Sequence, residues 1–149
     1  MSLFDKISDD LKAAMLAKQK DRLESLRAIK AALLLAKTES VAHEINEDQE
    51  MKILQKLVKQ RRESAEIFKT QNRTDLYETE VKEAAIIEEY LPKQMSESEL
   101  LPVLKAIIQR VGATSPKDMG KVMSAASKDL AGKADGKMIA DKVRELLGN

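Results

Sequence analysis

Cysteine is absent from the 149-residue chain, which excludes disulfides, thiolate nucleophiles and cysteine-based metal sites. Aromatic residues make up only 3%, without a single Trp, and the alternating β-branched runs that strands require are missing as well. The longest fully apolar run, from Ala31 to Ala36, is far shorter than the roughly 20 residues of a membrane span. The absence of these residue types and patterns predicts an all-helical, soluble protein that does not enter the membrane.

The N-terminus, from Ser2 to Asp10, lacks the basic start and the apolar stretch of a signal peptide, so a cytoplasmic location is predicted. His43 is the only histidine and lies in a polar stretch, so it is interpreted as a solvated imidazole without metal partners. No cofactor or metal is expected.

Motifs of catalytic centres are also missing. The sequence contains no Walker P-loop, GxGxxG, GxSxG or HExxH pattern. Adjacent acids such as Asp9 with Asp10, and Glu88 with Glu89, point apart on a helix and are typical of solvated faces. No catalytic residue is therefore predicted, and enzymatic activity stays open.

What the chain does contain is helical periodicity, which predicts four helices before Pro92. Asn46 is the expected N-cap of the third helix, and Asp75 with Glu78 matches a capping box at the start of the fourth. Pro92 should end the fourth helix at Leu91, because proline disfavours α geometry in the residue before it. The first predicted helix covers about 2–18, and the second begins near 21 and loses its pattern over 38–46. The third covers about 47–70 and the fourth about 75–91.

Three further helices are predicted after this break. Ser96 and Glu99 form a capping box, and Pro102 should bend that helix or delay its start. The helix should end at Gly112, the next should begin at Ser115, and the last should be capped by Asp135. The expected architecture is a four-helix N-terminal bundle in residues 1–94 and a three-helix C-terminal domain in residues 95–149.

The net charge is +1, yet two regions are locally basic. From Met51 to Arg73 the sequence has seven bases and two acids, and from Lys105 to Arg144 it has nine bases and four acids. Arg61 interrupts the apolar stripe of the third predicted helix, which indicates either a structural ion pair with another helix or a contact with a partner at a bundle edge. Lys52, Lys56, Lys59 and Arg62 lie on a more exposed face, for which a solvated basic stripe is the usual explanation.

Gly120 is predicted inside a helix, where glycine costs about 1 kcal/mol relative to alanine. Either another helix packs closely on that bare backbone, or a ligand approaches it. The lysines expected around the connection to the last helix are Lys121, Lys128, Lys133 and Lys137. The free amides at Gly136 suit a phosphate, or Gly136 is only a flexible cap residue.

Several motifs in this order resemble the YqeY family, over nearly the whole chain. They are Asp10 to Met15, Lys59 to Ser64, Arg73 to Leu76, Tyr90 to Pro92, Asp118 to Met123 and Gly132 to Lys137, with Leu26-Arg27. Pro102 departs from the family pattern at the start of one helix. The family is similar to the C-terminal tail of the B subunit of tRNA-dependent amidotransferases, in which a helical tail engages tRNA while the reactions occur in other domains.

The resemblance implies a GatB/YqeY-like fold and an accessory protein that associates with tRNA or another structured RNA. The expected contacts are Arg61, Arg62, Arg73, Gly120, Lys121, Lys133, Gly136 and Lys137. Two alternatives stay open. One is a glutamine-dependent carbon-nitrogen ligase, or a component of one, and the other is a helical module that docks on an amidotransferase or a translation-related protein.

Overall fold

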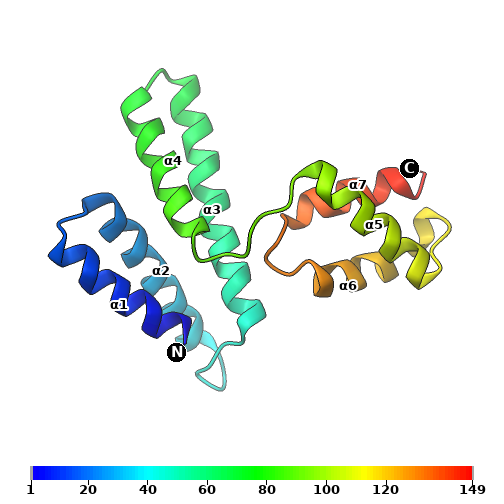
Figure 1. The fold of residues 1–149 in the computed structure, drawn as a ribbon, viewed down its shortest axis with the longest axis horizontal. Helices are drawn as coiled ribbons and strands as arrows, with labels where there is room; N and C mark the ends of the chain where they lie inside the picture. Colours follow the sequence, from blue (N-terminus) through cyan, green and yellow to red (C-terminus); the bar gives the residue numbers. More distant parts are fainter. Residues whose placement is uncertain (1, 149) are drawn as a thin grey trace. The chain divides into compact units, whose positions relative to one another are not determined.

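A computed structural model describes residues 2–148, and these form seven α-helices and one short 3-10 helix without any strand (Figure 1). The predicted all-α class is confirmed. The chain divides into two compact units, Met1–Leu91 (unit 1) and Pro92–Asn149 (unit 2). Among the described residues, no helix is long and apolar enough to cross a membrane.

Unit 1 consists of two antiparallel helix pairs (Figure 1). The helices are α1 (Leu3–Leu16), α2 (Lys20–Glu39), α3 (Glu47–Thr70) and α4 (Thr74–Glu88). α4 packs along α3 and also contacts α2, so α2 lies between α1 and the second pair. Buried side chains from all four helices form one core, including Ile7, Leu26, Ile29, Leu33, Leu54, Val58 and Ile87.

The ends of these helices follow the predictions only in part. Asn46 caps α3 as expected, and Gln49 completes a capping box with it. The capping box predicted for Asp75 and Glu78 is wrong, because the N-cap of α4 is Arg73, two residues before Asp75, and its side chain makes no cap hydrogen bond. α4 also ends at Glu88, before Leu91. The backbone there tightens into i to i−3 hydrogen bonds as it approaches Pro92.

Unit 2 contains α5 (Glu97–Val111), the 3-10 helix η1 (Pro116–Asp118), α6 (Met119–Asp129) and α7 (Gly136–Leu146). Their apolar faces meet in a second core with Leu100, Leu104, Ile107, Val122, Ala126, Ile139 and Val143. Ser96 and Glu99 form the predicted capping box of α5, and Gly112 ends that helix with a φ of 71°. Unit 2 is therefore a three-helix unit with its own core.

Pro102 does not delay the start of α5, which begins at Glu97 and continues through the proline. The proline removes the backbone hydrogen bond that would reach the carbonyl of Ser98, four residues earlier. Both Ser98 and Pro102 are exposed, so water can satisfy that carbonyl. The proline is tolerated because it stands near the start of an exposed helix face.

Candidate nucleic-acid interface

Arg61 of α3 faces Glu83 of α4, and the structure shows the ion pair that was one of its two predicted roles. The Nε atom of Arg61 lies 3.4 Å from Oε2 of Glu83, and the side chains are only 19% and 13% exposed. The contact is a charge pair without hydrogen-bond geometry, since Arg61 Nε is buried and has no hydrogen-bond partner among the described residues. Arg61 therefore connects two helices of unit 1 and is largely removed from the surface.

The other two predicted arginines also have carboxylate partners. Arg62 donates from Nη2 to Oε1 of Glu88 over 2.7 Å, which links α3 to the end of α4 a second time. Arg73 lies 3.5 Å from Asp75 through its Nε, and this interaction is the main reason why the pKa of the Asp75 carboxyl is lowered. Both arginines are about half exposed, so they could contact a ligand only by sharing or leaving these partners.

Three lysines of α3 lie beside these arginines without such partners. Lys52, Lys56 and Lys59 stand at i, i+4 and i+7, which places them on one face of the helix. All three are exposed, and none forms an ion pair within the described residues. We call them the α3 lysine row.

The α3 lysine row was interpreted from the sequence as a solvated face and was left out of the predicted site. One signal could have identified it: residues 51–62 contain five bases and no acid over about three helical turns. The structure shows that the two arginines of this stretch are neutralised by α4. The α3 lysine row therefore consists of cations without an ion-pair partner, whereas the two arginines of this stretch each have one.

The predicted lysines of unit 2 are exposed and have no ion pair within the described residues, but they do not form one group. Lys121 lies in the first turn of α6, whereas Lys133 and Lys137 follow its last turn. At 1.5 Å per residue the helix separates the two sets by roughly 12 Å. Lys121 therefore does not lie at the connection between α6 and α7, where it was predicted.

A lysine distant in sequence lies near Lys133. The backbone N–H of Met95 donates to the carbonyl of Lys133 over 2.9 Å, and the side-chain amide of Gln94 donates to the carbonyl of Gly132 over 2.6 Å. These bonds hold the segment before α5 against the loop before α7. Lys93 is exposed on that segment, so we group Lys93, Lys133 and Lys137 as the loop lysines.

The two glycines of the predicted site lie at helix starts. Gly120 is the second residue of α6 and not an interior residue as predicted, and a Cβ atom at this position would meet nothing within 4 Å. No neighbouring helix packs closely on it. Gly136 is the first residue of α7, and the carboxylate of Asp135 already accepts a hydrogen bond from the Lys137 N–H at this end.

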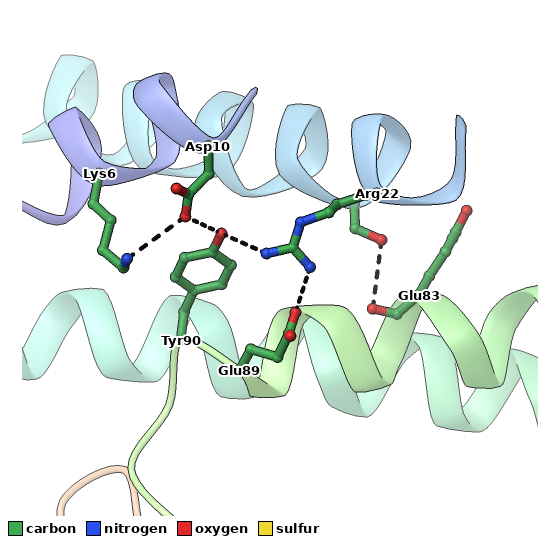
Figure 2. Close-up of polar contacts among 7 residues, drawn as sticks. Lys6, Asp10, Arg22, Glu83, Glu89 and Tyr90 are labelled. Atoms are coloured by element: carbon green, nitrogen blue, oxygen red, sulfur yellow. Dashed lines mark hydrogen bonds and ion pairs between the residues drawn. The ribbon is translucent and has the colours of Figure 1, made fainter. Parts of the chain in front are cut away.

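A polar network connects α1, α2 and the end of α4 in unit 1 (Figure 2). The Tyr90 hydroxyl donates to Oδ2 of Asp10 over 2.5 Å, and Arg22 donates to Glu89 over 2.6 Å. Burial, and then the hydrogen bond with Asp10, raise the pKa of Tyr90 strongly. Lys6 lies 3.7 Å from Asp10. These groups connect the middle of α1 to the start of α2 and the end of α4, and Asp10 and Glu89, which had been given no role, belong to this contact.

The hydroxyl of Ser25 is the only buried polar side chain of the described core and donates to the carbonyl of Glu83 over 3.5 Å. This contact joins α2 to α4 close to the Arg61 ion pair. No group of three or more metal-ligating side chains occurs in residues 2–148.

The geometry defines an all-helical protein of two units with exposed, unpaired lysines. The chain belongs to the family of Yqey-like proteins, which matches residues 4–147, and the predicted resemblance is confirmed. It is 28% identical over 147 residues to altered inheritance of mitochondria protein 41 of Pyrenophora tritici-repentis, covering 96% of this chain and 80% of the relative. It is 37% identical over 90 residues to the protein of the same name of Clavispora lusitaniae, covering 60% of this chain and 52% of the relative. Both relatives are named as mitochondrial proteins.

Proposed function

We propose that this protein associates with tRNA or another structured RNA through its phosphates, as an accessory protein to amidotransferase or other translation-related reactions. The α3 lysine row is the main support, because its three cations have no carboxylate partner while the neighbouring arginines do. Lys121 and the loop lysines would supply further contacts. The cytoplasmic location predicted from the sequence remains part of this proposal.

The spacing of the α3 lysine row suits a phosphate backbone. Its members rise about 6 Å and about 4.5 Å along the helix from one to the next, so three phosphates of one strand or of two adjacent strands come within reach. Few aromatic side chains are exposed for stacking on unpaired bases. Recognition by shape and phosphate position, as for a folded RNA, fits this surface.

The test is the binding of total tRNA to the full chain at several salt concentrations. If at least four phosphates are neutralised, affinity should fall about a hundredfold or more between about 50 and 200 mM salt. A variant with Lys52→Gln, Lys56→Gln and Lys59→Gln should lower the slope of log affinity against log salt by about 2 to 3. Failure to bind tRNA at the lowest salt, or binding indifferent to salt, would reject the proposal.

The matched control is a triple variant with the same change in net charge. Lys12, Lys20 and Lys105 are exposed lysines outside the proposed contacts, and their replacement by Gln should leave the salt slope within error of the wild type. An equal loss in both variants would show that net charge, and not the α3 lysine row, determines binding.

The two alternative functions are separated by different measurements. A glutamine-dependent ligase activity predicts release of ammonia from glutamine by the purified chain. A protein-docking module predicts partners that remain bound after nuclease treatment, whereas the RNA proposal predicts that co-purified material is lost with the RNA.

A further inference from the structure

The turn between α1 and α2 carries a group of exposed apolar side chains. Leu16, the last residue of α1, is 87% exposed, Met15 beside it is 54% exposed, and Ala17 follows as the exposed C-cap. Single exposed leucines are ordinary on protein surfaces, but these three residues are adjacent and lie at the free end of a helix pair (Figure 1). We call residues 15–17 the apolar tip.

The backbone of this turn is already hydrogen-bonded. The N–H groups at positions 17, 18 and 19 each donate to a carbonyl in the last turn of α1, over 3.0–3.2 Å. Backbone groups that are paired in this way can leave water at less cost than unpaired ones. The apolar tip can therefore enter a less polar surrounding without breaking these bonds.

Three lysines surround the apolar tip, and we call them the tip lysines. Lys12 stands four residues before Leu16 on the same helix face, Lys18 lies in the turn, and Lys20 is the first residue of α2. All three are exposed, and none has an ion-pair partner within the described residues. Residues 12–20 contain these three bases and no acid.

The acids nearest to this segment offset its charge only in part. Asp21 lies 3.4 Å from Lys82 of α4 and shares a pocket there with Asp75 and Glu78, where α2 meets α4. Asp9 is exposed on α1, about 10.5 Å before the last residue of the helix. The apolar tip is thus bordered by cations on both helices.

The turn at the other end of α2 has the opposite charge. Val41 is fully exposed there, about 30 Å along the helix from Lys20. Residues 38–48 contain four acids and no lysine or arginine. Of these two turns, only the apolar tip combines exposed apolar side chains with unpaired cations, and this combination suits an anionic lipid surface.

We propose that the apolar tip and the tip lysines bind the surface of membranes that contain anionic lipids. Leu16 and Met15 enter the boundary between headgroups and acyl chains, while the lysine stems lie along it and their ammonium groups stay with the lipid phosphates. The contact is peripheral, and no helix of the described residues could span a membrane. It departs from the sequence-based prediction that the protein does not enter the membrane, and it does not depend on RNA.

The experiment is co-sedimentation of the nuclease-treated full chain with vesicles of phosphatidylcholine, alone or with about one third phosphatidylserine. The expected affinity is comparable to that of a single myristoyl chain, about 10⁴ M⁻¹ or somewhat less, so half of the wild type should bind at roughly 0.1 to 1 mM anionic lipid. Binding to the neutral vesicles should be at least about tenfold weaker, because each lysine near an anionic surface strengthens binding severalfold.

Two triple variants test the tip lysines. Replacement of all three tip lysines by Gln should weaken binding to the anionic vesicles by about a hundredfold. The control replaces Lys105, Lys117 and Lys128, which are exposed lysines of unit 2, by Gln. It has the same change in net charge and should bind like the wild type.

Tryptophan substitutions test insertion, because the chain contains no Trp of its own. The emission of Leu16→Trp should shift to shorter wavelength when anionic vesicles are added, whereas that of Val41→Trp, at the acidic turn, should not. Leu16→Gln should bind at least about tenfold more weakly than the wild type. All of these positions are exposed, and circular dichroism should show wild-type helicity in every variant.

A wild type that does not bind anionic vesicles at about 1 mM lipid would overturn the proposal. So would equal losses in the two triple variants, or the same shift from both tryptophans. If replacement of the tip lysines abolishes tRNA binding and leaves vesicle binding intact, these lysines belong to the RNA surface, and the proposal is wrong.

Discussion

Arg61 and Glu83 form a largely buried ion pair in which the carboxylate bears an electrostatic cost that its partner only partly offsets. Burial raises the pKa of Glu83, and the nearby acids Glu80, Asp21 and Glu24 raise it further, whereas Arg61 lowers it by less than burial raises it. The main effect of the Arg61 guanidinium is therefore to reduce the free-energy cost of burying the Glu83 carboxylate between α3 and α4. Removing one partner should have a different effect from removing both.

Arg61→Met should lower the free energy of unfolding by about 2 to 3 kcal/mol, because it leaves Glu83 buried without a cation. Arg61→Met combined with Glu83→Leu should recover most of that loss, since a well-packed apolar pair of similar volume is often as stable as a buried ion pair. Urea unfolding followed by circular dichroism measures both. Asp129→Asn is the control, because it breaks the exposed Arg110 to Asp129 pair and should cost less than about 1 kcal/mol. Equal stability of Arg61→Met and the wild type would contradict this account.

The same ion pair predicts a pH dependence. A carboxyl whose pKa is raised in the folded protein contributes stability that is fully present below its unfolded pKa and is lost as pH rises through the folded value. Removal of Arg61 takes away the group that lowers the pKa of Glu83. The difference in melting temperature between wild type and Arg61→Met should thus grow as pH increases from about 4.5 to 7. With Glu83→Gln added, the difference should lose its pH dependence, and a difference that shrinks with rising pH would reject the assignment.

The sequence predicted the parts of the fold that depend on local patterns. Helical periodicity, the Asn46 N-cap and the Ser96 capping box depend on residues within a few positions of each other, and the structure confirms them. The Asp75 capping box failed because the N-cap lies two residues earlier, at Arg73, so that Asp75 is inside the first turn of α4 and its carboxylate pairs with Arg73.

The candidate site was predicted less completely than the helices, because it depends on contacts between residues that are distant in sequence. The sequence could predict that Arg61 forms an ion pair with another helix. It could not show that the partner is Glu83, which lies 22 positions away. The position of Lys93 beside Lys133 rests on hydrogen bonds between a linker and a loop about 40 residues apart, which periodicity cannot show. Lys52, Lys56 and Lys59 were visible as bases, yet their importance became clear only once the arginines were seen to be neutralised.

Tyr90→Phe should lower the free energy of unfolding by about 1 kcal/mol, because the hydroxyl donates to Asp10 of α1 and accepts from Arg22 of α2 beside the end of α4 (Figure 2). Tyr77→Phe is the matched control. Its hydroxyl has no hydrogen-bond partner among the described residues, so its loss should change stability by less than about 0.5 kcal/mol. Thermal and urea unfolding of the two variants measure the difference, and equal effects would show that the network adds no net stability.

Lys93→Gln should weaken tRNA binding as much as Lys133→Gln does, although 40 positions separate the two residues. The prediction follows from the bonds of Gln94 and Met95 to the loop of Gly132 and Lys133, which bring both cations to one surface of unit 2. Each substitution should reduce the salt slope by about 1 if the lysine neutralises one phosphate. Lys105→Gln, an exposed lysine of α5 outside this group, should leave the slope unchanged. If Lys133→Gln weakens binding and Lys93→Gln does not, the RNA contacts the α7 side of the loop alone, and the loop lysines do not act as one surface.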